Sequence, residues 1–282
     1  MKIKLDTTLI TGASSGIGLH LAHEFARHGH PLVLVAPQQG ELSTLAAHLT
    51  SSYGVDTRVI AADLEQPEAA QAIFDKTLGW NLEIGILVNN AGHGFRGNFW
   101  ELPIEKDISI IRLNIEAVLR LTKLFLPPMI SRNRGRILNT ASIAGFEPGP
   151  MLNVYHASKA FVLSWSEALA TELKDTGVKV TALCPGPTDT DFFPKANMEG
   201  VRGFQQGSVM APQDVAKAGY EGLVAEELFV VPGAANKAMV AARRVLSESA
   251  QASMNAKFYE EVPPDQWKRK RGDVETEAAM RS

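Results

Sequence analysis

Three side chains with complementary chemistry lie close together in the second half of the sequence. Tyr155 and Lys159 are four residues apart, so in a helix their side chains would share one face. Ser142 lies thirteen residues before the tyrosine. A phenol beside an ammonium can pass a proton to a carbonyl oxygen, and a serine hydroxyl can hold that oxygen in place. We therefore predict that Ser142, Tyr155 and Lys159 are catalytic, although each of them taken singly also fits a purely structural place.

This chemistry requires a phenol whose pKa lies near the working pH. A free tyrosine titrates near 10, so the pKa must fall to about 7, which corresponds to about 4 kcal/mol. One ammonium about 4 Å away supplies roughly that much at an effective dielectric constant of about 20. We therefore expect Lys159 to lower the pKa of Tyr155.

A glycine-rich run near the start of the chain is suited to holding a dinucleotide. Glycines at 12, 16 and 18 lie between a strand-like and a helix-like segment. They permit a tight turn and a close approach of phosphates, which the free N–H groups of the helix can bind. The spacing differs from Gly-x-Gly-x-x-Gly and from a P-loop, and a glycine turn without a ligand is the alternative. We predict that a dinucleotide contacts Gly12, Ser14, Ser15, Gly16, Ile17 and Gly18.

Strand-like and helix-like segments alternate along most of the chain. Apolar strands joined by helical crossovers indicate a parallel sheet that is covered on both faces. We predict an α/β fold with a doubly wound, mostly parallel, seven-stranded Rossmann-type sheet in a single domain, residues 1–232. Strands are expected at 5–11, 31–36, 55–61, 84–89, 136–140, 179–184 and 227–231. Helices are expected at 16–28, 41–52, 67–78, 103–130 (with a break near Asn114), 152–175 and 212–225.

Residues 233–282 are predicted to form a C-terminal helical extension that ends in a mobile tail. One helix is expected over 233–259, and two prolines at 263 and 264 then lead into a polar segment. The basic run at 268–271 is typical of a solvated tail, with weak attachment to an anionic lipid surface as the less favoured alternative. We expect removal of the residues after Tyr259 to leave turnover almost unchanged.

Composition excludes several classes of protein. The net charge of −3 gives no global attraction to nucleic acid or to an anionic membrane. The single Cys184 allows neither an internal disulfide nor a thiolate metal cluster, which suits a reducing cytosol. His20 and His23 are expected on a solvated helix face, so we predict no metal. The sequence contains no signal-peptide core and no apolar stretch long enough to span a bilayer, so we expect a cytoplasmic protein.

The sequence resembles the short-chain dehydrogenase/reductase family, in its single-domain form, over residues 5–232. The resemblance implies an oxidoreductase that uses NAD or NADP and acts on a carbonyl or a secondary alcohol. The likeness rests on Thr11–Gly18, Asp63-Leu64, Asn89-Asn90-Ala91-Gly92, Asn114, Ser142, Tyr155 to Lys159 and Pro185-Gly186-Pro187-Thr188-Asp189-Thr190.

The family pattern implies where the adenosine half of the coenzyme lies. Asp63 and Leu64 would flank the adenine. Asn90, Ala91 and Gly92 would border the adenosine ribose and form the floor of the cofactor cleft.

The same pattern implies roles around the nicotinamide half. Asn114 would hold a water that links Lys159 to solvent, and Lys159 would also bind the nicotinamide ribose. The carboxamide would meet Thr188 and Thr190, which follow Pro185 and Gly186 in the same coenzyme-binding stretch. Relatives commonly pair through two long helices, here 114–130 and 152–175, which implies a homodimer or homotetramer.

The residues that would choose the coenzyme depart from the family pattern. The second strand ends at Ala36, where an acid would select NAD through the ribose 2′-hydroxyl. The basic residue that NADP enzymes carry at 37 or 38 is replaced by Pro37 and Gln38. Ser14 and Gln38 can still hydrogen-bond a phosphate, without charge assistance. We predict NADP as the coenzyme, with NAD as the alternative.

Two loops are expected to border the substrate. Segments 145–152 and 192–204 mix aromatic and methionine side chains with glycine and proline. Such a mixture is typical of a lid over an apolar ligand, and equally of a lid packed shut. We predict reduction of a small-molecule apolar ketone, aldehyde or acyl-linked carbonyl. The alternatives are an NAD(H)-dependent alcohol dehydrogenase and a catalytically silent dinucleotide-binding sensor, while the glycine spacing disfavours a sugar-nucleotide epimerase.

Overall fold

The computed structural model describes residues 5–243 and 245–281, which form a seven-stranded parallel sheet covered by helices. The strand order is β3-β2-β1-β4-β5-β6-β7, and every neighbouring pair is parallel. The predicted fold class is therefore confirmed. The strands are β1 (Thr7–Thr11), β2 (Leu32–Ala36), β3 (Thr57–Ala61), β4 (Ile84–Asn89), β5 (Gly135–Thr140), β6 (Val178–Leu183) and β7 (Phe229–Val230).

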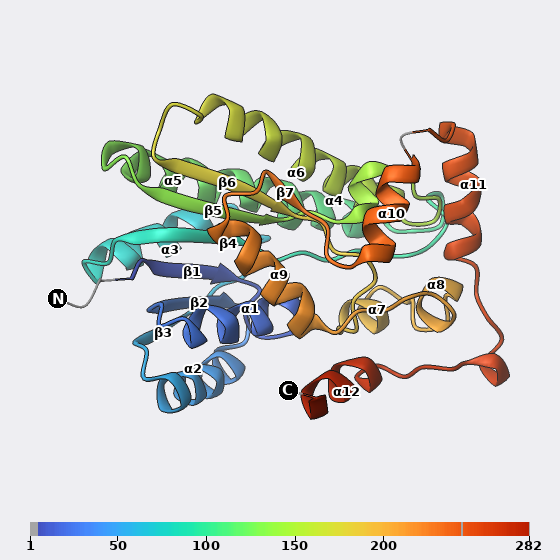
Figure 1. The fold of residues 1–282 in the computed structure, drawn as a ribbon, viewed down its shortest axis with the longest axis horizontal. Coiled ribbons are helices and arrows are strands. Elements are labelled where there is room, and N and C mark those ends of the chain that lie inside the picture. Colours follow the sequence, from blue (N-terminus) through green and yellow to red (C-terminus); the bar gives the residue numbers. More distant parts are fainter. Residues whose placement is uncertain (1–4, 244, 282) are drawn as a thin grey trace.

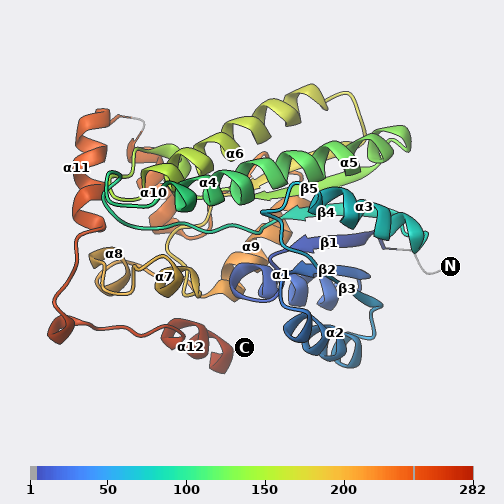
Figure 2. The same cartoon turned by 180° about the vertical axis from the view of Figure 1, so that it is seen from behind.

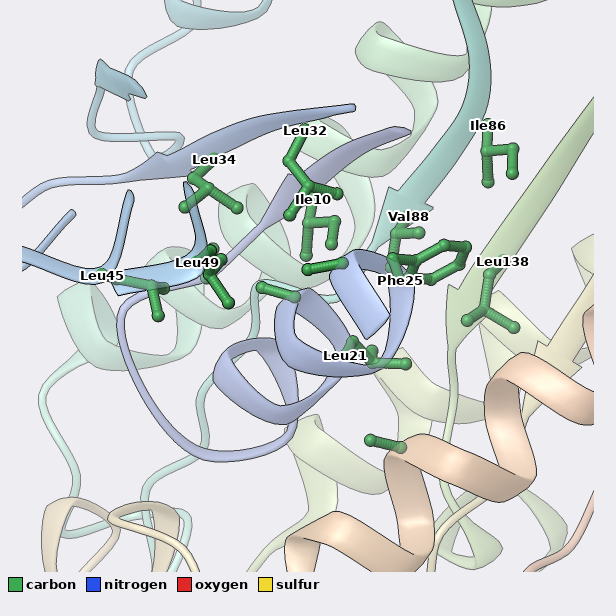
Figure 3. Packing of buried hydrophobic residues seen from close by; sticks show 14 of the residues in the cluster. Ile10, Leu21, Phe25, Leu32, Leu34, Leu45, Leu49, Ile86, Val88 and Leu138 are labelled. Atoms are coloured by element: carbon green, nitrogen blue, oxygen red, sulfur yellow. The ribbon is translucent and has the colours of Figure 1, made fainter. Parts of the chain in front are cut away.

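Alternating side chains along the strands build one apolar layer on each face of the sheet. Ile10 and Leu34 point to one face, where they meet α1 (Gly16–Arg27), α2 (Gln39–Tyr53) and α9 (Pro212–Val224). Figure 3 shows this layer around Phe25 of α1. Leu9 and Val35 point to the other face, which α3 (Ala69–Gly79), α5 (Ala117–Ser131) and α6 (Asn153–Glu172) cover. Both layers are buried, which explains the continuous apolar runs in the sequence.

The helix predicted over 103–130 has the irregularity expected near Asn114. It consists of α4 (Ile104–Ile111), a π-helical turn (Arg112–Glu116) and α5. A π-turn holds an extra residue and changes the direction of its side chains, and such turns often occur at functional sites. Asn114 lies in this turn and is 1% exposed.

Four further helices gather beyond the carboxyl ends of the strands (Figures 1 and 2). They are α7 (Phe192–Lys195), α8 (Arg202–Gln205), α10 (Ala234–Arg243) and α11 (Glu248–Phe258). The single helix predicted over 233–259 is therefore wrong: α11 has its own N-cap, in which the Ser247 hydroxyl accepts a hydrogen bond from Ala250 N–H at 3.3 Å. No helix within the described residues is long and apolar enough to cross a membrane.

The end of the chain is packed against the domain, unlike the mobile, solvated tail that the sequence predicted. It leaves α11, runs back past α8 and α7, and ends in α12 (Asp273–Arg281) (Figures 1 and 2). Two cations of the basic run make specific contacts, since Arg269 donates to the Phe204 carbonyl at 2.9 Å and Arg271 to Asp191 at 2.9 Å. Local composition could not reveal these partners because they lie more than sixty residues away in the sequence.

Candidate active site

One cavity of about 420 Å³ opens at the carboxyl edge of the sheet, beside the ends of β1 and β4, between which the strand order reverses. The structure brings nearly all of the predicted site residues to its walls. Gly18 and Asn114, both among the described residues, lie behind the wall. The predicted residues in the lining are Gly12, Ser14, Ser15, Gly16, Ile17, Gln38, Asp63, Leu64, Asn90, Ala91, Gly92, Ser142, Tyr155, Lys159, Pro185, Gly186, Thr188 and Thr190.

The glycine loop turns directly from β1 into α1 along one side of this cavity. Gly18 serves packing, because a Cβ there would lie 2.1 Å from the Gly12 carbonyl oxygen. Gly16 has φ +54°, and a Cβ there would lie 3.2 Å from the Thr190 side chain. Any side chain at 16 would therefore fill the gap between the loop and Thr190. With glycine at 16 the start of α1 stays open to the cavity, and free N–H groups at a helix N-terminus suit the pyrophosphate of a dinucleotide.

The turn after β4 is tied to the end of β1 by hydrogen bonds. The Thr11 hydroxyl accepts the N–H groups of Asn90 at 2.9 Å and Ala91 at 3.0 Å. The Asn90 amide donates to the Thr11 carbonyl at 3.0 Å and accepts from the Thr140 hydroxyl at 3.2 Å. Asn90 therefore braces three neighbouring strands as well as facing the cavity.

The predicted catalytic side chains converge at the centre of the cavity. Tyr155 and Lys159 lie on the same face of α6, as their spacing predicted, and the Lys159 ammonium is 5.7 Å from the centre of the Tyr155 ring. Lys159 Nζ donates to the Thr140 carbonyl at 2.8 Å. Ser142, two residues after β5, is close enough to the Tyr155 phenol for a hydrogen bond that acts on its pKa, and its hydroxyl donates to the Pro185 carbonyl at 3.3 Å. Its oxygen also accepts from Ala144 N–H at 3.1 Å, which fixes the hydroxyl in place.

The expected depression of the phenol pKa is wrong for the protein by itself. Burial raises the pKa of Tyr155 to about 12, and the hydrogen bond with Ser142 acts in the opposite direction without cancelling it. Burial also lowers the pKa of Lys159 to about 8. The physical reason is that both groups are desolvated, and desolvation penalises the phenolate and the ammonium alike. Desolvation therefore outweighs the attraction between phenol and ammonium, which by itself would lower the pKa of the phenol.

The lysine pKa predicts a pH-dependent stability. The pKa falls from 10.5 to about 8 on folding, so below about pH 8 both states hold the proton and the folded state bears a cost of about 3 kcal/mol. Between these values the unfolded state binds more protons, so stability rises with pH. Lys159→Met removes this cost, so its free energy of unfolding should exceed that of wild type by more at about pH 7 than at about pH 10. The two differences, measured by denaturant unfolding, should themselves differ by up to about 3 kcal/mol. A difference that is the same at both pH values would contradict this.

Asn114 lies close to the lysine but is fully engaged with its own surroundings. Its amide donates to the His93 carbonyl and to the Ser158 hydroxyl, both at 3.0 Å, and its oxygen accepts His93 N–H at 3.1 Å. Gly92 separates it from Lys159, since a Cβ there would be 3.1 Å from the Asn114 oxygen and 3.3 Å from the Lys159 nitrogen. The role of Asn114 in a proton path stays a prediction.

Sequence reasoning missed the part of the wall that the C-terminal extension contributes. This wall packs directly against the predicted loop 145–152 and is formed by Met239, Arg243, Asn255, Phe258 and Tyr259. Arg243 and Glu147 form a buried ion pair with side chains 7% and 5% exposed. No local pattern in the extension signals this role, because its partners lie about a hundred residues earlier.

A second polar pair, His156 and Tyr259, joins the C-terminal extension to α6, the helix that carries Tyr155 and Lys159. His156 Nδ1 lies 3.0 Å from the Glu147 carbonyl oxygen, which can only accept, so Nδ1 carries the hydrogen. His156 Nε2 therefore accepts the hydroxyl hydrogen of Tyr259 at 2.6 Å. Burial lowers the pKa of His156 to about 4, so the imidazole is neutral at physiological pH. This bond fixes α11 beside Tyr155.

The sequence is similar to a described family and to curated reductases. A family model described as short chain dehydrogenase matches residues 6–200. A very-long-chain 3-oxoacyl-CoA reductase from Phaeosphaeria nodorum is 44% identical over 176 residues, which are 61% of this chain and 52% of that protein. The human very-long-chain 3-oxoacyl-CoA reductase is 37% identical and covers 64% of this chain and 58% of its own length. The chain thus spans a little over half the length of these relatives.

Solved structures match over nearly the whole chain. A short-chain dehydrogenase from Sphingobium yanoikuyae in complex with NADPH has 34% identity and a TM-score of 0.76, with 93% of this chain and 100% of that chain covered. A bulky-bulky ketone specific alcohol dehydrogenase from Comamonas testosteroni has 34% identity and a TM-score of 0.73, with 86% and 93% covered.

Proposed function

The chain belongs to the short-chain dehydrogenase family, and from this premise we propose that it reduces an apolar carbonyl compound with NADPH as the coenzyme. The observation that carries the proposal is the placement of Ser142, Tyr155 and Lys159 in the same cavity as the glycine loop. When bound, a nicotinamide dinucleotide supplies the hydride. The lining fits such a group, because Gly16 puts no side chain between the loop and Thr190, and the adjoining α1 N-terminus suits a pyrophosphate.

The residues of the chain supply the proton and the orientation. With its pKa raised to about 12, Tyr155 holds its proton at neutral pH and can donate it to a carbonyl oxygen. Ser142 would hold that oxygen beside the phenol. Lys159 is cationic below about pH 8, and a positive charge beside the phenol favours the phenolate that remains after donation. The ring of Tyr155 is fixed by packing against Phe192, with ring centres 5.1 Å apart.

Coenzyme preference follows from the end of β2. Ala36 brings no carboxylate to repel a 2′-phosphate, and the next two residues, Pro37 and Gln38, carry no positive charge. We expect kcat/KM to be about tenfold higher with NADPH than with NADH, the size of one uncharged hydrogen bond. Pro37→Arg adds a cation at an exposed position and should increase this ratio further. Equal or better turnover with NADH would contradict the preference.

The substrate wall supports a largely apolar ligand with one polar group. Its lining combines Ile143, Leu152, Phe192, Phe193, Met198 and Phe258 with the paired Glu147 and Arg243. We expect NADPH oxidation with apolar ketones, aldehydes or acyl-linked carbonyls, and the names of the relatives point to the same classes. A carbonyl panel tests this directly. Reduction of small charged sugars only would contradict the proposed substrate class.

A further inference from the structure

A buried carboxylate between two predicted coenzyme contacts has all of its hydrogen-bond partners in the C-terminal tail. Asp189 lies between Thr188 and Thr190, and its side chain is 1% exposed. It accepts hydrogen bonds from three backbone N–H groups, those of Gly272 at 2.9 Å, Val274 at 2.9 Å and Glu275 at 3.1 Å. Arg271 lies 3.6 Å away and balances its charge.

These bonds fix the start of α12 to the loop at 188–190. The first N–H groups of a helix have no partner within the helix, and the helix dipole favours a negative charge there. An N-cap side chain normally satisfies them, whereas here the acceptor comes from a residue more than eighty positions earlier. The loop at 188–190 and the start of α12 therefore keep one fixed arrangement.

Further contacts hold the rest of the segment over the cavity. We call residues 188–207 the lid, because Thr188, Phe192 and Met198 line the cavity, and residues 267–275 the clamp. Arg271 binds Asp191 at 2.9 Å. Gln205, 1% exposed, accepts the N–H groups of Lys268 at 2.6 Å and Arg269 at 3.0 Å. The clamp thus contacts the lid at both ends.

The clamp is in turn anchored to the body of the domain. Glu275 lies 2.7 Å from His20 Nε2 on α1, and its carbonyl accepts from Gln213 on α9 at 3.2 Å. The histidine and Arg271 hold the pKa of Glu275 below its ordinary value, against the effect of burial. Because α1 begins at the glycine loop, the clamp connects the two sides of the coenzyme site.

We propose that Asp189 and Arg271 are positioning residues through which the clamp holds the lid, and with it Thr188 and Thr190, in place for coenzyme binding. This inference rests on the proposed function. It reverses the expectation from sequence that the residues after Tyr259 are dispensable, because those residues supply the partners of Asp189.

The test compares Asp189→Asn and Arg271→Gln with Glu277→Gln, a matched control in the exposed pair with Arg281 on the same helix. In Asp189→Asn one of the two acceptor oxygens becomes an NH₂ group, so at least one of the three backbone N–H groups faces a donor, and the negative charge at the helix N-terminus is lost. We expect the dissociation constant for NADPH, titrated without a carbonyl compound, to rise about tenfold in Asp189→Asn and by less in Arg271→Gln. KM for NADPH should follow, while kcat changes by less than about threefold and the control behaves as wild type.

Each result bears on the proposal. Unchanged NADPH binding in both variants would overturn it, and so would a loss of kcat with unchanged binding. If Asp189→Asn does not fold, Arg271→Gln decides by the same criteria. A wild-type protein that binds NADPH but reduces no carbonyl compound would contradict the proposed function and leave the clamp standing. A wild type that binds neither coenzyme would contradict both.

Discussion

Replacing Tyr155 with phenylalanine should lower kcat by about 10³-fold, the contribution of a positioned general acid. The substitution removes the hydroxyl that carries the proton and keeps the ring that packs against Phe192. Coenzyme binding should therefore stay within about threefold of wild type, because the glycine loop and Lys159 are untouched. The measurements are steady-state turnover with one accepted carbonyl compound and a coenzyme titration.

Tyr53→Phe is the matched control for this experiment. Tyr53 is on α2, outside the cavity, and its hydroxyl makes only a long contact of 3.5 Å with His23 among the described hydrogen bonds. Its turnover should equal that of wild type. Turnover of Tyr155→Phe within about tenfold of wild type would remove the phenol from the reaction. A catalytically silent sensor would show no turnover in either protein.

Glu147→Gln should lower the free energy of unfolding by about 3–5 kcal/mol, since it leaves the Arg243 guanidinium buried without its counter-ion. Burial raises the pKa of Glu147, against the opposing effect of Arg243, and burial also lowers the pKa of Arg243. Each charged group is therefore destabilised by desolvation when its partner is removed. Denaturant unfolding of the purified variant measures the loss. The same change also removes a negative charge from the substrate wall.

A second substitution distinguishes the broken pair from a general packing defect. Glu147→Gln combined with Arg243→Met should recover most of the stability, because an uncharged buried pair has no desolvated ion. Glu226→Gln is the control, since Glu226 pairs with Arg136 at 3.3 Å with its side chain 45% exposed. That change should cost less than about 1 kcal/mol. A double variant no more stable than Glu147→Gln would contradict the ion-pair explanation.

The parts of the fold that depend on local pattern could be predicted from sequence. Strands buried on both faces appear as short apolar runs. The glycine loop after the first strand is recognisable because the tight turn into α1 needs glycine, as at Gly18, where a Cβ would collide with the Gly12 carbonyl oxygen. The four-residue spacing placed Tyr155 and Lys159 on one face, and the family pattern located the other lining residues. The assigned catalytic and coenzyme roles, the oligomeric state and the cytoplasmic location stay predictions.

The parts of the fold and of the site that depend on long-range contacts could not be predicted from sequence. Arg243 meets Glu147, and Asp189 meets the start of α12, across about a hundred and about eighty residues of sequence. A basic run with distant acidic partners looks the same, as sequence, as a solvated tail. The predicted pKa of the Tyr155 phenol was wrong for a related reason. The cost of burial depends on how deeply the side chain is enclosed, and residue spacing does not reveal this.

The most direct test of the proposed reaction is isotope transfer from labelled NADPH to an apolar ketone in the presence of the wild-type protein. The coenzyme carries deuterium in both positions on the nicotinamide carbon that gives up hydride, and the product alcohol is analysed by mass spectrometry. We expect one deuterium on the former carbonyl carbon with wild type, and no product above background with Tyr155→Phe. An unlabelled alcohol, or NADPH bound by wild type but never oxidised across the carbonyl panel, would contradict the assignment.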